Sequence, residues 1–345
     1  MIKRFFNKIF GFFSTDLAMD LGTANTLAYI TEKGIVLNEP SVVAMNVDDN
    51  TVEAVGSEAK KMFGRTHARV NTIRPMKDGV IADFDMTNKM IQYFIKKILH
   101  KYRFFKPRMV VGVPTCITQV EKKAVIDAST MAGIREVYLI EEPMAAAIGV
   151  GIPVHRPEGN MVIDIGGGTT EIAVISLGGI VTDKSIKVAG DEFTDNIQNY
   201  MKTRYNVAVG DNMAEKIKIN VGSAMTELED PPPNFAVHGR DLMNGIPKEV
   251  IVTYKEIANA LNNAIEQIEA AIMHTLFTTP PALSADIYNT GLYLTGGGGM
   301  LRGLDKRISL KTKLPVYVAE DPLRAVARGT GIALKNTSGF SFLIQ

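Results

Sequence analysis

A glycine-containing motif between two strand-like runs occurs twice in this chain and constrains its fold more than any other feature. In the second copy, Asp164 and the glycines Gly166, Gly167 and Gly168 lie between the apolar run Met161–Ile163 and a second apolar run. Glycines place no Cβ in the way, so successive backbone N–H groups can point at an anion. A carboxylate beside such a turn suits Mg²⁺, which accompanies phosphates and prefers oxygen ligands. For this copy alone, a plain hairpin turn is the alternative.

The first copy has its parts in the same order. Asp20, Gly22 and Thr23 follow the apolar residues 17–19 and precede the run 27–30. A strand–turn–strand unit that recurs in both halves of a chain is typical of two similar domains that share one ligand. We therefore expect a duplicated fold with one phosphate-binding hairpin in each half.

A third glycine cluster, Gly296 to Gly299, follows an apolar run and precedes residues 300–304. This order predicts a strand that leads into a helix through a bend where the backbone passes close to a ligand. A helix N-terminus with surplus glycines is the alternative. Four consecutive glycines carry a large entropic cost on folding, and this cost favours the ligand contact.

The composition allows two sizeable cores, because 46% of the 345 residues are hydrophobic and 22% are charged. A net charge of +1 gives no general attraction to nucleic acid. Cys116 is the only cysteine, which excludes internal disulfides and favours a reducing cytosol. We expect it to be a small buried apolar residue rather than a nucleophile. The five histidines lack ligand spacing, so a zinc site is not expected.

Residues 1–13 form an amphipathic pattern at helical spacing, and no acidic residue precedes Asp16. Basic residues on one side and apolar residues on the other predict a helix in the membrane interface, over anionic headgroups. A signal peptide and a helix packed on the protein's own surface are the alternatives, and Lys8 interrupts the apolar core of a signal peptide. No stretch reaches the roughly 18 apolar residues of a membrane span. The apolar side consists of Ile2, Phe5, Phe6, Ile9, Phe10, Phe12 and Phe13.

The rest of the chain alternates predicted strands and helices. In the first half, strands are expected over 32–55, 108–113 and 137–140, and helices over 87–102, 120–132 and 143–149. In the second half, helices are expected over 191–205, 212–219, 254–277 and 322–335, with an irregular stretch around Pro231–Pro233. The predicted inward residues are Met90, Phe94 and Ile98 in the first half and Ile257, Leu261, Ile265, Ile268 and Ile272 in the second.

Small residues in helices 143–149 and 322–335 permit close helix packing, as a hinge between duplicated domains requires. The first of these helices begins with Glu141 and Glu142. Two glutamates at a helix start can interact favourably with the helix dipole; the alternative is that one of them holds a water molecule.

Together, these motifs resemble the superfamily of ATPases that contains actin, sugar kinases and heat-shock chaperones. Residues 20–27, 73–84, 141–149 and 164–171 are similar to the bacterial actin family MreB, and the resemblance runs from about residue 14 to 336. Met300 is a departure, because a smaller residue is expected after three glycines; it is expected to alter the adenine pocket slightly.

The resemblance implies an α/β fold with duplicated actin-like, ribonuclease H-like domains that face a nucleotide cleft, each with a smaller inserted subdomain. Domain I is expected over 14–150, with the terminal helix 322–336 returning to it. Domain II is expected over 151–321, with an inserted subdomain over 190–255 and a tail over 337–345.

The same resemblance implies roles for individual residues with ATP and Mg²⁺ as cofactors. Glu142 is expected to position the attacking water with help from Thr169, in a weak ATPase. Asp20 and Asp164 are expected to hold Mg²⁺ through its waters. The residues implied to contact ATP are Gly22, Thr23, Ala24, Asn25, Gly166, Gly167, Gly168, Glu215, Lys216, Ile217, Lys218, Gly297, Gly298, Gly299 and Met300. For Glu215 and Lys218, a charged helix face is the alternative.

The resemblance further implies a cytoplasmic protein that forms filaments on the inner membrane, directs wall synthesis and maintains rod shape. Its partners would be other copies of itself, in paired protofilaments joined by helix 120–132, and RodZ, MreC and MreD, with no nucleic acid. Phe104 and Phe105, flanked by cations, are expected to enter the same membrane, with loop packing as the alternative. A small-molecule kinase and a chaperone-like ATPase are the alternative functions.

Overall fold

The computed structural model describes residues 16–30, 33–66, 68–101, 107–335 and 343–344. Contacts within the chain divide it into two compact units. Unit 1 contains the described residues up to Pro157, Ser176–Gly179 and the described residues from Arg324 onward, and unit 2 contains Glu158–Ile175 and Ile180–Leu323. The predicted membrane residues in 1–13, together with Phe104 and Phe105, lie outside the described residues.

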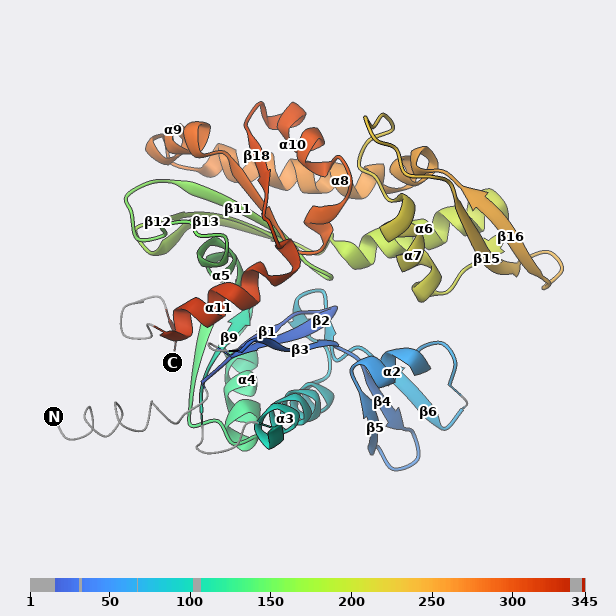
Figure 1. Cartoon of the computed structure of the whole chain (residues 1–345), viewed down its shortest axis with the longest axis horizontal. Coiled ribbons are helices and arrows are strands. Elements are labelled where there is room, and N and C mark those ends of the chain that lie inside the picture. Colours follow the sequence, from blue (N-terminus) through green and yellow to red (C-terminus); the bar gives the residue numbers. More distant parts are fainter. Residues whose placement is uncertain (1–15, 31–32, 67, 102–106, 336–342, 345) are drawn as a thin grey trace. The chain divides into compact units, whose positions relative to one another are not determined.

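Unit 1 is built on a five-stranded sheet with the order β10-β9-β1-β2-β3. The hairpin strands β1, β2 and β3 are antiparallel, whereas β9 and β10 run parallel to β1. Helices α5 and α11 cover one face of the sheet, and α3 and α4 cover the other (Figure 1). The bounds are β1 Leu17–Leu21, β2 Asn25–Ile30, β3 Gly34–Pro40, α3 Phe84–Lys101, β9 Arg108–Val113, α4 Gln119–Met131, β10 Glu136–Glu141, α5 Glu142–Gly149 and α11 Ala325–Lys335.

A small sheet with the order β5-β4-β6 is inserted between β3 and α3, with its own apolar cluster. Its elements are β4 Val43–Asn46, β5 Val52–Val55, α2 Ser57–Met62 and β6 Val70–Ile73, followed by the two-stranded ladder β7 Met76–Lys77 and β8 Val80–Ile81. The C-terminal residue Ile344 pairs with Leu139 of β10 in an antiparallel bridge.

Unit 2 repeats this plan, with the sheet order β13-β12-β11-β17-β18. Again the first two strands, β11 and β12, are antiparallel, β13 lies next to β12, and β17 and β18 run parallel to β11. The bounds are β11 Asn160–Ile165, β12 Thr170–Ser176, β13 Gly179–Ile186, α6 Gly190–Tyr205, α8 Tyr254–Thr278, α9 Pro281–Thr290, β17 Leu292–Thr295, α10 Leu304–Thr312 and β18 Val316–Val318, with short 3-10 helices at Gly298–Met300 and Pro322–Arg324.

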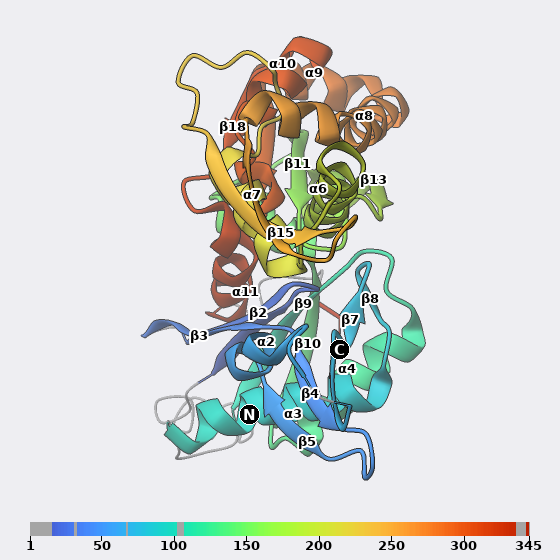
Figure 2. The same cartoon turned by 90° about the vertical axis from the view of Figure 1, so that its right-hand side faces the viewer.

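The second insertion also lies between the third and fourth sheet strands of its unit. It contains β14 Val207–Ala208, α7 Asp211–Val221, β15 Phe235–Asp241 and β16 Pro247–Val252, and Figure 2 shows α7 beside β15. Because strand order, strand direction and point of insertion agree between the two units, the duplication predicted from the paired motifs is confirmed.

The predicted core residues are buried. Met90 and Phe94 of α3 are fully buried and Ile98 is nearly so, in the core cluster of unit 1. Capping boxes fix the starts of two helices, at Thr118 with Glu121 and at Thr253 with Glu256. The predicted stripe of α8 is fully buried in the core cluster of unit 2, and it consists of Ile257, Leu261, Ile265, Ile268 and Ile272.

Helices α5 and α11 approach each other through glycines. A Cβ on Gly329 would lie 1.7 Å from the backbone O of Ala145, and one on Gly149 would lie 1.9 Å from the O of Ala325. The small residues predicted to permit close packing therefore do so within unit 1.

One prediction from the sequence is wrong, and some elements were not predicted. Cys116 is exposed, because it lies in the turn between β9 and α4 and not in either element. Helix α8 ends before Pro280 and Pro281. Pro281 then starts α9, which was not predicted, although proline suits a first helical turn. The strands β15 and β16 and the helix α2 were not predicted, because their apolar residues are few and half exposed.

Candidate functional site

The hairpin of unit 1 places Asp20 at the end of β1, where it is buried. Asp20 pairs with Leu27 across the hairpin and with Gly112 of β9 on the other side. The turn 22–24 follows directly, and a Cβ on Gly22 would lie 2.7 Å from the backbone O of Asn25. Glycine is therefore required for the turn itself, beside any role in binding.

Hydrogen bonds from two other segments hold this turn. Ser41 donates its hydroxyl to the backbone O of Gly22 at 2.6 Å, and its N–H donates to the O of Ala24 at 3.0 Å. The hydroxyl of Thr23 accepts a hydrogen bond from the N–H of Gly79 at 3.2 Å. These bonds hold Gly22, Thr23 and Ala24 against the segments that contain Ser41 and Gly79. Neither Ser41 nor Gly79 was singled out from the sequence, because each is remote from the motif along the chain.

Glu142 lies in the same unit, at the first residue of α5, and is buried. The first turn of a helix is where the helix dipole favours a carboxylate. A Cβ on Gly112 would lie 3.8 Å from Cγ of Glu142, and Gly112 is also the register partner of Asp20. The same Cβ would lie 3.1 Å from Cγ1 of Val326 and 3.5 Å from Cγ2 of Thr330, so the glycine permits close packing of α11 on the sheet beside these two acidic residues.

Asp164 takes the equivalent place in unit 2, at the end of β11. The hydroxyl of its register partner Thr295 donates a hydrogen bond to Oδ1 at 2.6 Å. Burial raises the pKa of Asp164 to about 6, and the bond from Thr295 opposes this shift. The sequence suggested no role for Thr295, although its place at the end of a strand before four glycines is a usable signal. A cation beside Asp164 would favour its charged form.

The second glycine hairpin is held from both ends. The N–H of Gly166 donates to the O of Thr169 at 2.9 Å, which closes the turn. The first residues of α6 hold it from outside: Gly190 N–H donates to Gly166 O at 3.1 Å and Asp191 N–H to Gly167 O at 2.7 Å. Gly166 and Gly167 are partly exposed, while Gly168 and Thr169 are buried. The hairpin is therefore a supported cradle with its tip accessible.

Two of the residues predicted on α7 lie together. Glu215 and Lys218 form an ion pair at 2.7 Å one helical turn apart. Lys216 is exposed and Ile217 is fully buried in the core, so the structure does not bring these two to the face of Glu215 and Lys218.

The third glycine cluster packs against β11. Gly296 has a φ of +78°, and a Cβ there would lie 2.3 Å from the backbone O of Ile165 and 2.9 Å from Oδ1 of Asp164. A Cβ on Gly298 would lie 2.3 Å from Cγ2 of Ile165. Gly299 is buried, and Gly297 and Met300 are exposed. The close approach expected of this cluster is therefore made to the Asp164 strand of the same unit.

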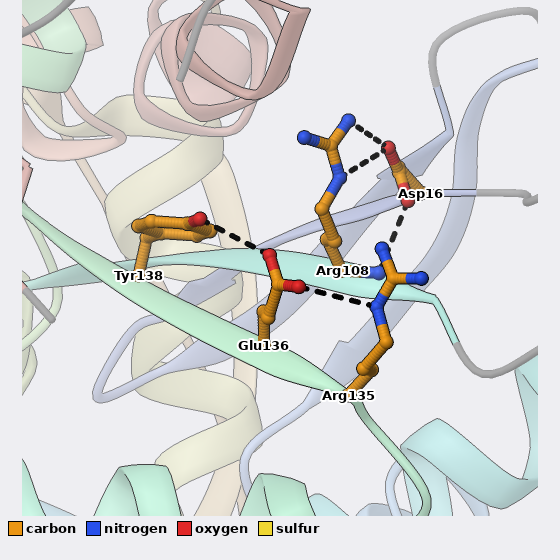
Figure 3. Close-up of polar contacts among 5 residues, drawn as sticks. All are labelled: Asp16, Arg108, Arg135, Glu136 and Tyr138. Carbon is orange, nitrogen blue, oxygen red and sulfur yellow. Dashed lines mark hydrogen bonds and ion pairs between the residues drawn. The ribbon is translucent and has the colours of Figure 1, made fainter. Parts of the chain in front are cut away.

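A polar cluster lies at the opposite end of the unit 1 sheet (Figure 3). The guanidinium of Arg108 pairs with Oδ2 of Asp16 at 2.5 Å, and the N–H of Arg108 donates to Oδ1 at 3.0 Å. Although burial disfavours the guanidinium charge, the hydrogen bond and charge of Asp16 raise the pKa of Arg108. Arg135 pairs with Glu136 at 3.3 Å beside them. The cluster joins the starts of β1, β9 and β10.

No helix of the described residues is long and apolar enough to cross a bilayer. Within the same residues, no group of three or more histidines, cysteines and carboxylates is placed to hold a metal ion.

Comparison with known proteins gives one consistent result. A family model described as MreB/Mbl protein matches residues 14–341. The cell shape-determining protein MreB of Escherichia coli (strain K12) is 50% identical over 341 residues, which cover 97% of this chain and 96% of that protein. The cell shape-determining protein Mbl of Bacillus subtilis (strain 168) is 49% identical over 324 residues, covering 94% of this chain and 97% of that protein.

Among solved structures, MreB 5 of Spiroplasma citri bound to AMPPNP superposes with a TM-score of 0.88 at 37% identity, covering 94% of this chain and 97% of that chain. The predicted actin-like fold class is thus confirmed. Because the family model spans nearly the whole sequence and the relatives match at half identity over full length, the chain belongs to the MreB/Mbl family.

Proposed function

We propose that this protein is an ATP-dependent, actin-like cell shape determinant that assembles into filaments on the inner membrane surface. The observation that carries the proposal is the pair of buried aspartates, Asp20 and Asp164, each at the end of the first strand of one of two equivalent sheets. In a member of a cell shape family, such a duplicated hairpin suits the phosphates of a nucleotide.

The residues of each hairpin suit a polyphosphate. In unit 1, Gly22, Thr23, Ala24 and Asn25 offer backbone N–H groups and a hydroxyl. In unit 2, the hairpin 166–169 offers a hydroxyl and the N–H groups that follow Gly166, and we propose that it contacts the terminal phosphate. Glu215, which pairs with Lys218 at 2.7 Å, suits the ribose, and Gly297 and Met300, both exposed, suit the base. The relative from Spiroplasma citri was solved with AMPPNP, an ATP analogue, which supports ATP as the nucleotide here.

The donor set also suits Mg²⁺ in its hydrated form. Each unit offers one carboxylate at the hairpin, Asp20 or Asp164, and Mg²⁺ is usually held by one or two carboxylates, substrate phosphates and waters. The raised pKa of Asp164 fits such an ion, because a cation favours the carboxylate that burial disfavours. When bound, Mg²⁺ supplies charge that stabilises the leaving phosphates.

Glu142 is proposed to orient the attacking water and Thr169 to assist, in a weak ATPase. The carboxylate of Glu142 accepts a hydrogen bond from the water, whose oxygen then bonds to the γ-phosphorus as the bond to the ADP oxygen breaks. Both protons of the water leave with the released phosphate. Catalysis of this kind depends on positioning and electrostatics. Hydrolysis is proposed to weaken head-to-tail contacts, which build open filaments because they do not close.

Membrane binding is proposed for residues 1–13 and for Phe104 with Phe105. The described residues that follow these two segments, Asp16 and Arg108, pair with each other at one end of the unit 1 sheet (Figure 3). Both segments therefore join the fold at the same place, which supports their joint action on one membrane. RodZ, MreC and MreD are proposed partners on the family resemblance alone.

Sedimentation with ATP and anionic vesicles tests the proposal. We expect the protein to pellet with ATP, with more in the pellet when vesicles are present, and electron microscopy to show filaments on the lipid. Protein that stays in the supernatant under all conditions would exclude the filament function. A small-molecule kinase is not favoured, because the full-length relatives are cell shape proteins.

A further inference from the structure

The ammonium of Lys218 is surrounded by three acceptors of its own unit. It donates to the backbone O of Gly190 at 2.7 Å, to the hydroxyl of Thr194 at 3.0 Å, and to Oε2 of Glu215 at 2.7 Å. An ammonium has three N–H donors, so these contacts use all of them. The side chain is about one-sixth exposed, at 16%.

One of these partners, Gly190, is the first residue of α6 and also holds the second glycine hairpin. Gly190 accepts from Lys218 through its O and donates through its N–H to Gly166 O at 3.1 Å. The next residue, Asp191, donates to Gly167 O at 2.7 Å. A continuous chain of hydrogen bonds therefore runs from α7 through the start of α6 to the hairpin.

The atoms around Gly190 are closely packed, so this series of hydrogen bonds has little freedom to move. A Cβ on Gly190 would lie 3.2 Å from Gly166 O and 3.5 Å from Nζ of Lys218. Thr194, one turn along α6, adds a second link, since its hydroxyl lies 3.0 Å from Gly190 O and 3.1 Å from Oε2 of Glu215. The charged lysine strengthens the bond to Gly190, because hydrogen bonds from ionised donors are the stronger ones.

We infer that Lys218 is a positioning residue for the phosphate-binding hairpin 166–169, which it braces through Gly190 and α6 before any nucleotide is bound. This role rests on the proposed function, in which the hairpin contacts the terminal phosphate. It differs from a direct contact to ribose, because it acts in the free protein and favours ATP over ADP. Glu215 and Thr194 hold the lysine in place.

Amide hydrogen exchange in the nucleotide-free protein tests whether Lys218 supports the hairpin 166–169; we call this support the brace. In Lys218→Met we expect the amides of Gly166, Gly190 and Asp191 to exchange about tenfold faster, equivalent to about 1.4 kcal/mol. Thr194→Val keeps the shape of the side chain and removes only the hydroxyl, so it should give a smaller increase at the same amides. Lys248→Met is the matched control, because Lys248 also links a carboxylate, Asp241, to a backbone O, that of Tyr205.

The affinities for ATP and ADP distinguish support of the hairpin by Lys218 from a direct contact of Lys218 with the ribose. ATP and ADP share the ribose, so loss of a ribose contact weakens both equally, whereas loss of the brace should lower the ratio of ATP to ADP affinity about tenfold. Unchanged exchange in Lys218→Met, or equal losses for both nucleotides, would overturn the inference. If Lys218→Met does not fold, unchanged exchange in Thr194→Val would overturn it. Wild-type protein that binds no ATP would refute the proposed function, while the exchange result would still decide the brace.

Discussion

At the scale of single residues, the equivalent aspartates of the two units have different neighbours. Asp20 and Asp164 are both buried at the end of a first strand, but their partners across the parallel register are Gly112 and Thr295. Gly112 permits close packing of Val326 from α11, whereas the hydroxyl of Thr295 donates a hydrogen bond to Asp164. The aspartate motif is therefore the same in both units, but the residue that pairs with the aspartate on the neighbouring parallel strand differs.

Replacement of Asp164 by asparagine should stabilise the nucleotide-free protein at pH 8. Burial raises the pKa of Asp164 from 3.8 to about 6, so the charged form costs the folded state about 3 kcal/mol above pH 6. The cost falls as pH drops from 6 and is absent below about pH 4, where the carboxyl is protonated in both states. Asparagine keeps an acceptor for Thr295 and is never charged. Thermal unfolding followed by circular dichroism should show a higher Tm for the variant at pH 8 and equal Tm values near pH 4.

The same variant should lose Mg²⁺-dependent tightening of nucleotide binding. An equal gain in ATP affinity from Mg²⁺ in both proteins would contradict the proposed role of Asp164 in holding the ion.

Replacement of Glu142 by alanine should slow phosphate release about a hundredfold or more while nucleotide binding remains, since general-base positioning contributes 10²–10⁴-fold in enzymes generally. Single-turnover phosphate release measured beside ATP affinity checks this. An unchanged release rate would refute the role of Glu142, and a loss of ATP binding would reassign it to binding.

At the scale of elements, the contact between α5 and α11 is the most constrained feature of unit 1. Each helix presents a glycine to the backbone of the other, Gly149 to Ala325 and Gly329 to Ala145. Since backbone atoms cannot move aside as a flexible side chain does, even one methyl group forces the helices apart.

Gly329→Ala should therefore lower the free energy of unfolding by about 3 kcal/mol, at the upper end of the usual cost of overpacking. The midpoint of urea unfolding measures the change. Gly210→Ala is the control, because no atom lies within 4 Å of a Cβ there and its φ of −80° suits alanine. A similar midpoint for both variants would show that α5 and α11 separate readily.

At the scale of the whole molecule, membrane binding is proposed to come from two segments that join the fold beside the Asp16–Arg108 pair. Deletion of residues 1–13 should reduce the fraction bound to anionic vesicles and leave ATP hydrolysis unchanged. Vesicle flotation beside a phosphate-release assay checks this. Full binding after the deletion would transfer the role to Phe104 and Phe105, and substitution of both by alanine is the matching test.

The sequence predicted the motifs of the candidate site better than it predicted the features that depend on tertiary surroundings. Local patterns were sufficient for the hairpins, for the stripe of α8 and for the small residues of α5 and α11, because each depends on the spacing of neighbouring residues. The exposure of Cys116 and the start of α9 at Pro281 were missed, because a turn and a first helical residue depend on what surrounds them.

The sequence by itself determined the duplication, the α/β class and the family, since these follow from motifs whose residues are close together in the chain. Only the tertiary structure decided which residues support the motifs: Ser41 and Gly79 at the first hairpin, Thr295 at Asp164, and Lys218 behind Gly190. These partners lie far apart in sequence and meet because sheet register and helix packing bring them together, so no local pattern can specify them.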